Sequence, residues 1–479
     1  MSTTITISPA ALRVLHALEQ NGYPAYIVGG CLRDAMRGQT PHDMDVTTAA
    51  TPAKMLEIFS RAGLRTIETG LKHGTVTALA DGEPIECTTY RLDGSYTDGR
   101  HPDSVLFTDR IADDLARRDF TVNAMACRLP AAALPDFACD VALTVEIGRD
   151  AELVDLYGGQ EDLAAGVLRC VGDPYRRFEE DALRILRCIR FSVQLGFTVE
   201  PRTRAALSAL GDRLSKISRE RCAAEWMRML ESPMPLGNGL TLIEEAQLWQ
   251  YVLPHLPCAP SPADIARATL LPPDAPLRMA QLMRTPCDIY RKENPESAPA
   301  ELAHVSCSAL RLSNAVTRQT AAYLDGSYAL CPQNDAALRR MMAHYRDLTA
   351  RVLLLGGVCA MDDTHCRSLA RKGGGGQTIS ADALPASYRR AMTRCEEIAA
   401  RGDCISTEGL DIDGKTLVRF GFRGAEIGAA LSFLLSLVLE YPEYNRLELL
   451  IDRALDAKEE GMFLPENQKK FPGMPKFSP

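Results

Sequence analysis

The stretch IVGGCLRDAMRGQTPHDMDVTT, residues 27–48, decides the fold of the first part of this chain. An apolar run that begins at Ala25 ends at a pair of glycines, and a segment that can form a helix starts near Arg33. The chain then returns through Asp43 and Asp45 into a second β-prone run. This order predicts a strand, a tight glycine turn, a helix and a second strand.

Two carboxylates, Asp43 and Asp45, stand two positions apart where the second strand begins. Residues i and i+2 of a strand point to the same face, so these side chains are expected to lie side by side. Carboxylates that close repel each other unless they share a proton or a cation. Divalent metals relieve the repulsion, and a Mg²⁺ pair is what phosphoryl and nucleotidyl transfer need. Backbone N–H groups at Gly30 can approach a phosphate, and Arg33 lies near enough in sequence to pair with it.

Taken singly, each of these features is typical of an N-capping Asp beside an ordinary glycine turn. The joint pattern, G-G-x-x-R-D followed by D-x-D-x-x-T, is much rarer. It resembles the signature of the nucleotidyltransferase superfamily that includes CCA-adding enzymes and bacterial poly(A) polymerases. Asp43 and Asp45 match the positions that hold the catalytic metals in that superfamily.

The composition limits the remaining choices. A chain of 479 residues with 46% hydrophobic and 24% charged residues is expected to form two to four globular domains. No export signal and no membrane-spanning segment is recognisable, and 15 scattered cysteines without metal-ligand spacing suit a reducing cytosol, so a cytoplasmic protein is expected. The net charge of −8 argues against a general nucleic-acid binder, but residues 169–228 carry 13 Lys and Arg against 8 Asp and Glu. A basic patch is therefore predicted next to the proposed chemistry.

A hairpin is predicted over residues 74–90, with Asp81-Gly82 in its turn. Its second arm carries Glu86, which becomes a third acidic ligand if the hairpin lies beside the strand of Asp45. The other interpretation is a solvent-facing Glu on an alternating strand, and the sequence leaves both open. The polar segment after it, residues 91–102, reads as a loop, and CCA-adding enzymes have a flexible loop at this position that enzymes adding only C lack.

The segment DLARRDFTVNAMA, residues 114–126, places three adjacent charges before an apolar run. Its arginines can meet phosphates and Asp119 can accept from a ribose hydroxyl, although a solvated helix end would look similar. The segment closely resembles the second motif of the same family. The resemblance implies that Arg118 contacts the incoming nucleotide.

A strong helix is predicted from about residue 174 or 178 to Leu195, and Asp181 and Arg184 would share one of its faces. The Asp would accept from the exocyclic amine and the Arg would donate to the ring nitrogen that both CTP and ATP present. UTP and GTP present a donor and an acceptor in the opposite order, so they would not match. The alternative is a surface ion pair between Glu180 and Arg184. The pattern E-D-x-x-R-x-x-R-x-x-R resembles the family's template motif, in which the Asp and first Arg read the base. By that match Asp181, Arg184, Arg187 and Arg190 bind nucleotide.

Residues 409–416, GLDIDGKT, match the phosphate-binding pattern G-x-x-x-x-G-K-T. Their context argues against that function, because no apolar strand precedes them and Asp411 and Asp413 would repel a triphosphate. The longer segment 410–439 instead resembles the tail of CCA-adding enzymes, which grips the elbow of tRNA.

The resemblance implies a class II CCA-adding enzyme of the α+β class. Its nucleotidyltransferase head with a mixed sheet would span residues 1–150, followed by an all-helical neck (151–255), body (256–400) and tail (401–479). It would add C, C and A to the 3′ end of tRNA from CTP and ATP, using two Mg²⁺ ions and releasing pyrophosphate. The alternatives are a poly(A) polymerase, a CC-only or A-only enzyme, or a P-loop or RNA-binding protein. The expected partners are tRNA, CTP and ATP, without a membrane, and a homodimer is one assembly open to the chain.

Overall fold

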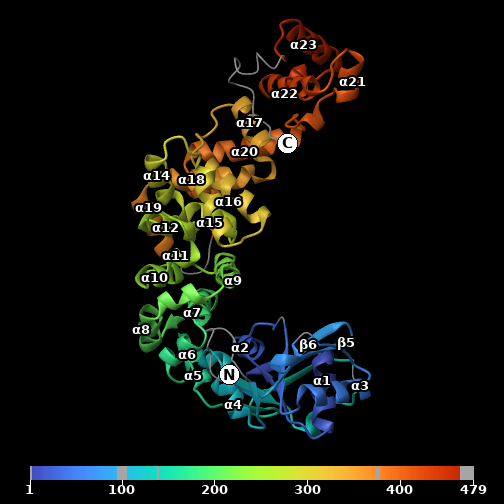
Figure 1. Ribbon diagram of the computed structural model, residues 1–479, viewed down its shortest axis with the longest axis vertical. Coiled ribbons are helices and arrows are strands. Elements are labelled where there is room, and N and C mark those ends of the chain that lie inside the picture. The colour runs from blue at the N-terminus through green and yellow to red at the C-terminus, as the bar shows by residue number, and fades with distance from the viewer. Residues whose placement is uncertain are drawn as a thin grey trace. The chain divides into compact units, whose positions relative to one another are not determined.

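The computed structural model describes residues 3–41, 43–68, 70–93, 105–137, 140–372 and 378–463. The chain divides into two compact units, residues 1–254 and 255–479, which are traced from blue to green and from green to red in Figure 1. The first unit contains the sheet and the second is helical, as the predicted α+β class requires.

A seven-stranded mixed sheet forms the centre of the first unit. The strands follow the order β11-β9-β2-β3-β6-β5-β4, and every neighbouring pair is antiparallel except β3 with β6. Their bounds are β2 (Ala25–Val28), β3 (Asp45–Thr48), β4 (Arg65–Ile67), β5 (Thr75–Ala80), β6 (Glu83–Thr89), β9 (Met125–Arg128) and β11 (Glu152–Asp155). The predicted mixed sheet and hairpin are confirmed, and β11 carries the sheet a few residues past the predicted boundary at residue 150.

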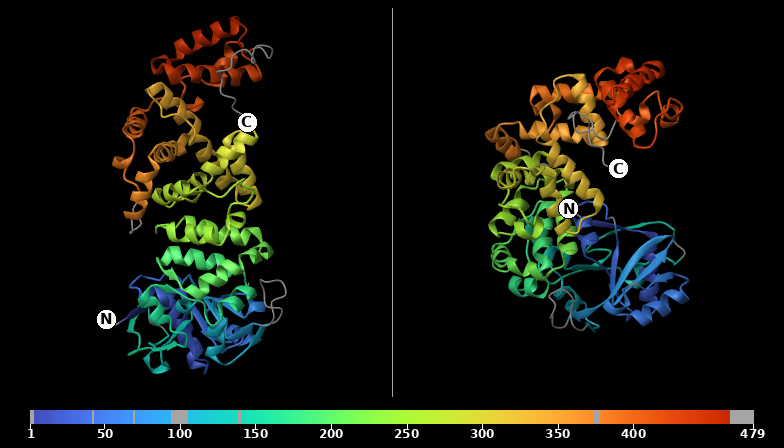
Figure 2. Two further views of the ribbon diagram at one scale, coloured as in Figure 1. Left: turned by 90° about the vertical axis from the view of Figure 1, so that its left-hand side faces the viewer. Right: turned by 45° about the horizontal axis from the view of Figure 1, so that its top comes forward.

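One face of the sheet packs in a large hydrophobic core, and the other face carries a smaller apolar cluster beside charged residues. Helices α1 (Pro9–Gln20) and α3 (Pro52–Arg61) pack on the core face, seen in blue in Figures 1 and 2, where Phe59 and Ile85 are fully buried. Both helices begin with Pro after Ser8 or Thr51, as their sequences predict. Because successive strand residues alternate between faces, burying Ile85 turns Glu86 to the opposite face.

Smaller elements complete the head. Strand β1 (Thr4–Ile7) pairs with β10 (Leu143–Glu146), and β7 (Arg91–Asp93) pairs with β8 (Val105–Phe107). Helices α2 (Gly30–Met36) and α4 (Ile111–Ala116) and the short 3₁₀ segments η1 (Leu71–His73), η2 (Thr121–Asn123) and η3 (Ala131–Ala133) lie between strands. The predicted loop begins in β7, and its residues 94–102 lie outside the described residues.

The rest of the first unit is helical apart from the two-residue strands β12 (Val167–Leu168) and β13 (Thr198–Val199). Its elements are α5 (Gly159–Ala165), α6 (Pro174–Glu180), α7 (Leu183–Leu195), α8 (Pro201–Ala209), η4 (Gly211–Lys216), α9 (Arg219–Leu230), α10 (Gly237–Glu245) and α11 (Trp249–Val252). The predicted single helix up to Leu195 is wrong, because it breaks at Asp181. That residue ends α6 with an extended backbone (φ −139°), and its carboxylate accepts the N–H of Leu183, the first residue of α7.

The second unit consists of helices in all its described parts. They are α12 (Pro262–Leu270), α13 (Ala275–Leu282), α14 (Arg284–Glu293), α15 (Pro299–Ala309), α16 (Asn314–Gly326), α17 (Asp335–Tyr345), η5 (Arg346–Leu348), α18 (Thr349–Cys359), α19 (Asp363–Lys372), η6 (Ala381–Ala383), α20 (Ala386–Arg401), η7 (Thr407–Gly409), α21 (Gly414–Arg419), α22 (Ala425–Glu440), η8 (Pro442–Tyr444) and α23 (Leu447–Glu459). None of the helices within the described ranges is long and apolar enough to cross a membrane.

The P-loop-like segment does not have the structure of a phosphate-binding loop. Helix α21 has six residues, and its first free amide is already taken because the carboxylate of Asp413 accepts the N–H of Thr416. The 3₁₀ turn η7, rather than a strand, precedes it. A negative cap at that position repels phosphate, which confirms that the motif is a chance match.

Candidate active site

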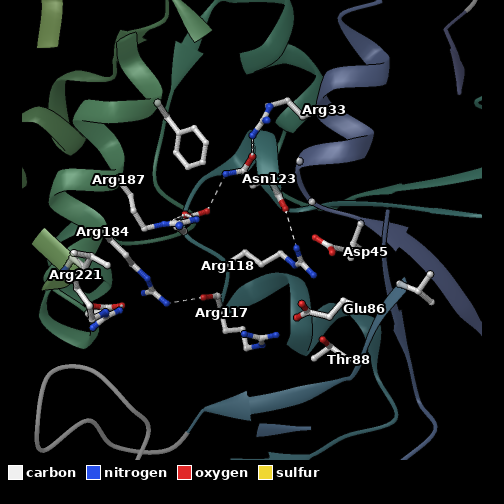
Figure 3. Close-up of a pocket in the computed structure, with 18 residues that line it drawn as sticks. Arg33, Asp45, Glu86, Thr88, Arg117, Arg118, Asn123, Arg184, Arg187 and Arg221 are labelled. Carbon is white, nitrogen blue, oxygen red and sulfur yellow. Dashed lines mark hydrogen bonds and ion pairs between the residues drawn. The ribbon is translucent and has the colours of Figure 1, made fainter. Parts of the chain in front are cut away.

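A cavity of about 490 Å³ opens on the charged face of the sheet, within the first unit. Strands β2, β3 and β6, the segment after α4, and helices α7 and α9 supply its walls (Figure 3). Six arginines and four carboxylates line it, namely Arg33, Arg117, Arg118, Arg184, Arg187, Arg221, Asp45, Glu86, Asp119 and Asp181. The excess of positive charge suits an anionic ligand.

Asp45 and Glu86 face each other at the bottom of this cavity. They are register partners on the parallel strands β3 and β6, so both carboxylates project from the same face. Figure 3 shows the two side chains on adjacent strands, with Arg118 pointing toward them from the opposite wall. The predicted placement of the hairpin beside the strand of Asp45 is confirmed.

Asp43 lies before the start of β3 and not in the strand. The prediction that it shares a strand with Asp45 is therefore wrong. Strand β2 ends at Val28, whose partner is Asp45, because the chain turns at Gly29 with φ +82°. Strand β3 therefore begins at Asp45, and Asp43 precedes it as an exposed residue outside the cavity lining. Asp43 is still close enough for its charge to act on Asp45.

The protein raises the pKa of Asp45 to about 6. Although the side chain stays open to the cavity, the surrounding atoms displace water from it, and this desolvation is the largest cause. The negative charge of Glu86 acts in the same direction, while Arg118 lowers the pKa. Two facing carboxylates that resist joint ionisation are suited to a divalent cation, whose charge removes the repulsion.

The described residues contain no group of three or more His, Cys, Asp or Glu side chains that could together hold a metal ion. Asp45 and Glu86 form a pair of oxygen ligands, the type that hard cations such as Mg²⁺ prefer. Mg²⁺ keeps several water molecules and needs only one or two carboxylates besides substrate phosphates. The donor set therefore fits a divalent metal that a phosphate-bearing ligand helps to hold.

The raised pKa of Asp45 predicts a pH-dependent penalty on the metal-free fold. The folded state binds the proton of Asp45 more tightly than the unfolded chain, so stability falls as the pH rises from about 4 through 6. Asp45→Asn removes this penalty and is expected to raise the thermal unfolding midpoint at pH 8 but not at pH 4. Thermal unfolding in a chelator, with Mg²⁺ added back at pH 8, measures this. An equal difference at both pH values would contradict the assignment.

The glycine turn lets a guanidinium reach this site. A Cβ atom at Gly29 would lie 3.3 Å from Nη1 of Arg118 and 3.8 Å from Oδ2 of Asp45, so a larger residue would crowd both groups. Arg118 donates from Nη2 to the buried carboxylate of Asp114 at 3.2 Å and from Nη1 to the carbonyl of Asn123 at 3.4 Å. The predicted nucleotide-contacting arginine is thus held beside the carboxylate pair.

Arg33 and Arg187 line the cavity from two different helices, α2 and α7. Arg33, on α2, donates to Asp34 and, from Nη1, to Oδ1 of Asn123 at 2.7 Å. Arg187 forms an ion pair with Asp119 at 2.7 Å. Burial alone would raise the pKa of Asp119, but the Arg187 guanidinium and the Asn123 hydrogen bond hold it down to about 2.

Asp181 and Arg184 both line the cavity, although the helix break separates them. Asp181 forms an ion pair with Arg221 on α9 at 3.0 Å. Arg184 donates to the carbonyl of Arg117 at 3.0 Å and forms the ion pair with Glu180 that was the alternative interpretation, at 2.8 Å. The ion pair of the alternative interpretation is therefore present, and base reading by Arg184 stays a prediction.

Arg190 is not brought to the cavity lining with the other predicted residues. The α7 helix turns it toward Glu225 on α9, which takes its guanidinium, and it lies over the ring of Phe191 at 4.0 Å. The predicted row of guanidiniums therefore ends at Arg187, because three-residue steps drift around a helix with 3.6 residues per turn.

Several lining residues have no role in the sequence prediction. They are Asn123, Phe191, Arg221 and Thr88. Asn123 lies inside the second motif, and the R-E-R spacing at the start of α9 was the only signal for Arg221. Phe191 looks like one more apolar residue of a helix, so nothing in the sequence marks it.

Comparison with known proteins gives two family matches, which together lie between residues 25 and 258. Residues 25–169 match the Poly A polymerase head domain, and residues 196–258 match the probable RNA and SrmB-binding site of polymerase A. The CCA-adding enzyme of Levilactobacillus brevis is 41% identical over 238 residues, and that of Lactiplantibacillus plantarum is 39% identical over 243 residues. These matches cover 50% and 51% of this chain, and the chain spans about half of each relative, 54% in both cases.

The fold resembles solved structures over nearly its whole length. The CCA-adding enzyme of Bacillus stearothermophilus in complex with CTP matches with a TM-score of 0.64 and 24% identity, covering 94% of this chain and 98% of that one. The Thermotoga maritima CCA-adding enzyme complexed with tRNA matches with a TM-score of 0.53 and 19% identity, covering 93% and 94%. The chain is therefore similar to CCA-adding enzymes over about half its length, and its residues 25–169 match the Poly A polymerase head domain.

Proposed function

We propose that this protein is a CCA tRNA nucleotidyltransferase, which adds C, C and A to the 3′ end of tRNA from CTP and ATP. One observation carries the proposal: the Asp45–Glu86 carboxylate pair lies at the bottom of an arginine-lined cavity in a Poly A polymerase head domain. The relatives that match this head are CCA-adding enzymes, and solved relatives hold CTP, ATP or tRNA.

In this proposal Asp45 and Glu86 would hold Mg²⁺, and the nearby Asp43 would add its negative charge to the site. Bound Mg²⁺ supplies a lower pKa for the attacking 3′-hydroxyl and neutralises charge on the departing pyrophosphate. Arg33 and Arg118 bind the triphosphate, with the glycine turn at Gly30 allowing the phosphates to approach the backbone. Positive charge on both sides of the chain of phosphates orients the α-phosphate without a covalent intermediate.

Nucleotide choice is assigned to Asp181 and Arg184. Each carboxylate oxygen of Asp181 already accepts one hydrogen bond, from Leu183 or Arg221, and each can accept another. The exocyclic amine of C or A would donate to Asp181, while Arg184 donates to the ring nitrogen. U and G present the opposite polarity, so they leave buried groups unpaired and are rejected.

The remaining parts are assigned by the same proposal. The matched RNA-binding segment 196–258 lies in the predicted neck, and the helices of residues 256–400 and 401–479 serve as body and tail that bind tRNA. A homodimer and a cytoplasmic location remain predictions, and the described cysteines are free thiols as a reducing compartment requires.

A primer-extension assay tests the proposal. The substrate is tRNA lacking its last three nucleotides, incubated with one labelled nucleotide at a time and then with pairs. CTP alone is expected to add two residues, CTP with ATP three, and UTP or GTP none. A long series of products with ATP alone would identify a poly(A) polymerase instead. That alternative agrees with the match to the Poly A polymerase head domain. Addition that stops after CC would identify a CC-only enzyme.

A further inference from the structure

Asn123 is a buried residue at the centre of the cavity wall, and its amide contacts two opposite charges. It ends the 3₁₀ segment η2 and is 7% exposed. Its Oδ1 accepts from Nη1 of Arg33 at 2.7 Å, and its Nδ2 donates to Oδ1 of Asp119 at 3.1 Å. Because the oxygen faces a cation and the nitrogen faces an anion, the amide has one favourable orientation.

The same residue reaches two more arginines. The other carboxylate oxygen of Asp119 accepts from Nε of Arg187 at 2.8 Å, so Asn123 is joined to Arg187 through one intermediate. The backbone carbonyl of Asn123 accepts from Nη1 of Arg118. Figure 3 shows Asn123 between Arg33, Arg118 and Arg187, which come from three separate parts of the sequence.

An aromatic ring supports two of these guanidiniums. Arg33 and Arg187 each lie 5.3 Å from the centre of the Phe191 ring, at the distance of a cation–π contact. Arg33 belongs to α2 near the sheet, whereas Arg187 belongs to α7. The path Arg33–Asn123–Asp119–Arg187 therefore joins the phosphate side of the cavity to the side that carries Arg184.

We propose that Asn123 is a positioning residue that fixes Arg33 and the Asp119–Arg187 pair relative to each other, so that triphosphate and nucleoside are bound as one unit. The inference rests on the proposed function only in taking the ligand to be a ribonucleoside triphosphate. Without the amide, Arg33 keeps Asp34 and the contact with the Phe191 ring but loses its link to Asp119. The arginine side chains are then less fixed before the nucleotide binds, so binding must also order them. The nucleotide therefore binds more weakly, before any chemical step.

A double-mutant cycle on CTP binding tests the proposal. The dissociation constant is measured for the full chain with Mg²⁺ and without tRNA, in wild type, Asn123→Leu, Arg33→Ala and the double variant. Asn123→Leu keeps the shape but removes both amide contacts and is expected to weaken binding about tenfold. Arg33→Ala should then weaken binding far less in the Asn123→Leu background than in wild type, because Arg33 is already displaced.

Two further variants separate positioning from folding. Asn123→Asp keeps the acceptor for Arg33 but sets a carboxylate against Asp119, so it should weaken CTP binding at least as much as Asn123→Leu. Asn294→Asp, an exposed site at the end of α14, adds the same charge and should bind CTP like wild type. If Asn123→Leu lowers the thermal unfolding midpoint strongly, Asn123→Ser replaces it in the cycle.

The outcomes are distinct. An Arg33→Ala effect of the same size in both backgrounds overturns the proposal and leaves Asn123 a purely structural residue. Wild type that binds CTP but extends no tRNA refutes the proposed function, while the cycle still decides the role of Asn123. If the wild-type protein binds neither CTP nor ATP, both the proposed function and the positioning role of Asn123 are refuted.

Discussion

Replacing Asp45 with Asn is expected to abolish nucleotide addition, lowering kcat by about 10³-fold or more, because metal-held charge is worth several kcal/mol in the transition state. Asp45 is the carboxylate that the structure places inside the cavity, opposite Glu86. Asn preserves its shape but cannot carry the charge that binds a divalent cation. CMP incorporation into tRNA lacking its CCA end, followed under single-turnover conditions, measures the loss.

The fold of the variant should be intact, because ionised Asp45 is held at an unfavourable position in the metal-free protein. Asp136→Asn, an exposed carboxylate of the same unit, is the matched control and should keep full activity. Asp43→Ala is expected to lose transfer as well if Asp43 joins the ion. Retained activity in Asp45→Asn would refute the metal assignment, and loss on Lys415→Ala instead would revive the P-loop interpretation.

The head could be predicted from sequence because its signals are local. The apolar run at Ala25, the glycine turn, Pro52 after Thr51 and the hairpin turn each specify their element with neighbouring residues. The exact start of β3 could not be predicted in this way. It depends on where β2 ends, since Asp43 has no strand partner once the chain has turned at Gly29.

The cavity shows the limit of local patterns more clearly. The helix period from Pro174 to Leu195 continues through Asp181, so apolar spacing gives no sign of the break where Asp181 leaves the helical backbone and its carboxylate accepts the N–H of Leu183. Asn123 finds its partner Arg33 at a separation of 90 residues. Residues whose role is set by such distant contacts become visible only when the sheet and helices α7 and α9 are packed together.

Replacing Arg184 with Ala is expected to relax nucleotide choice more than it slows addition of the correct nucleotide. Arg184 lies in the first turn of α7 and is 9% exposed. Glu180 and the carbonyl of Arg117 hold its guanidinium, so its direction is fixed before any nucleotide arrives. A well-made contact to a base edge discriminates by about 1–3 kcal/mol, or roughly 5- to 150-fold. In the variant, the ratio of kcat/KM for CTP to kcat/KM for UTP should therefore decrease by a factor within this range. Primer extension with each nucleotide measures both values.

Removing Arg184 also takes one ion-pair partner from Glu180 and one donor from the Arg117 carbonyl. A control must therefore separate the loss of these contacts from the loss of base reading. Arg176→Ala deletes an exposed arginine of the neighbouring helix α6, which does not line the cavity, and should leave the CTP to UTP ratio unchanged. Arg184→Lys keeps a positive charge but cannot make the same forked contacts, so it should relax choice almost as much as Ala. Because UTP is rejected by an unpaired donor rather than by space, a larger cavity alone cannot admit it. If Arg184→Ala still rejects UTP as wild type does, another residue of the cavity must read the base.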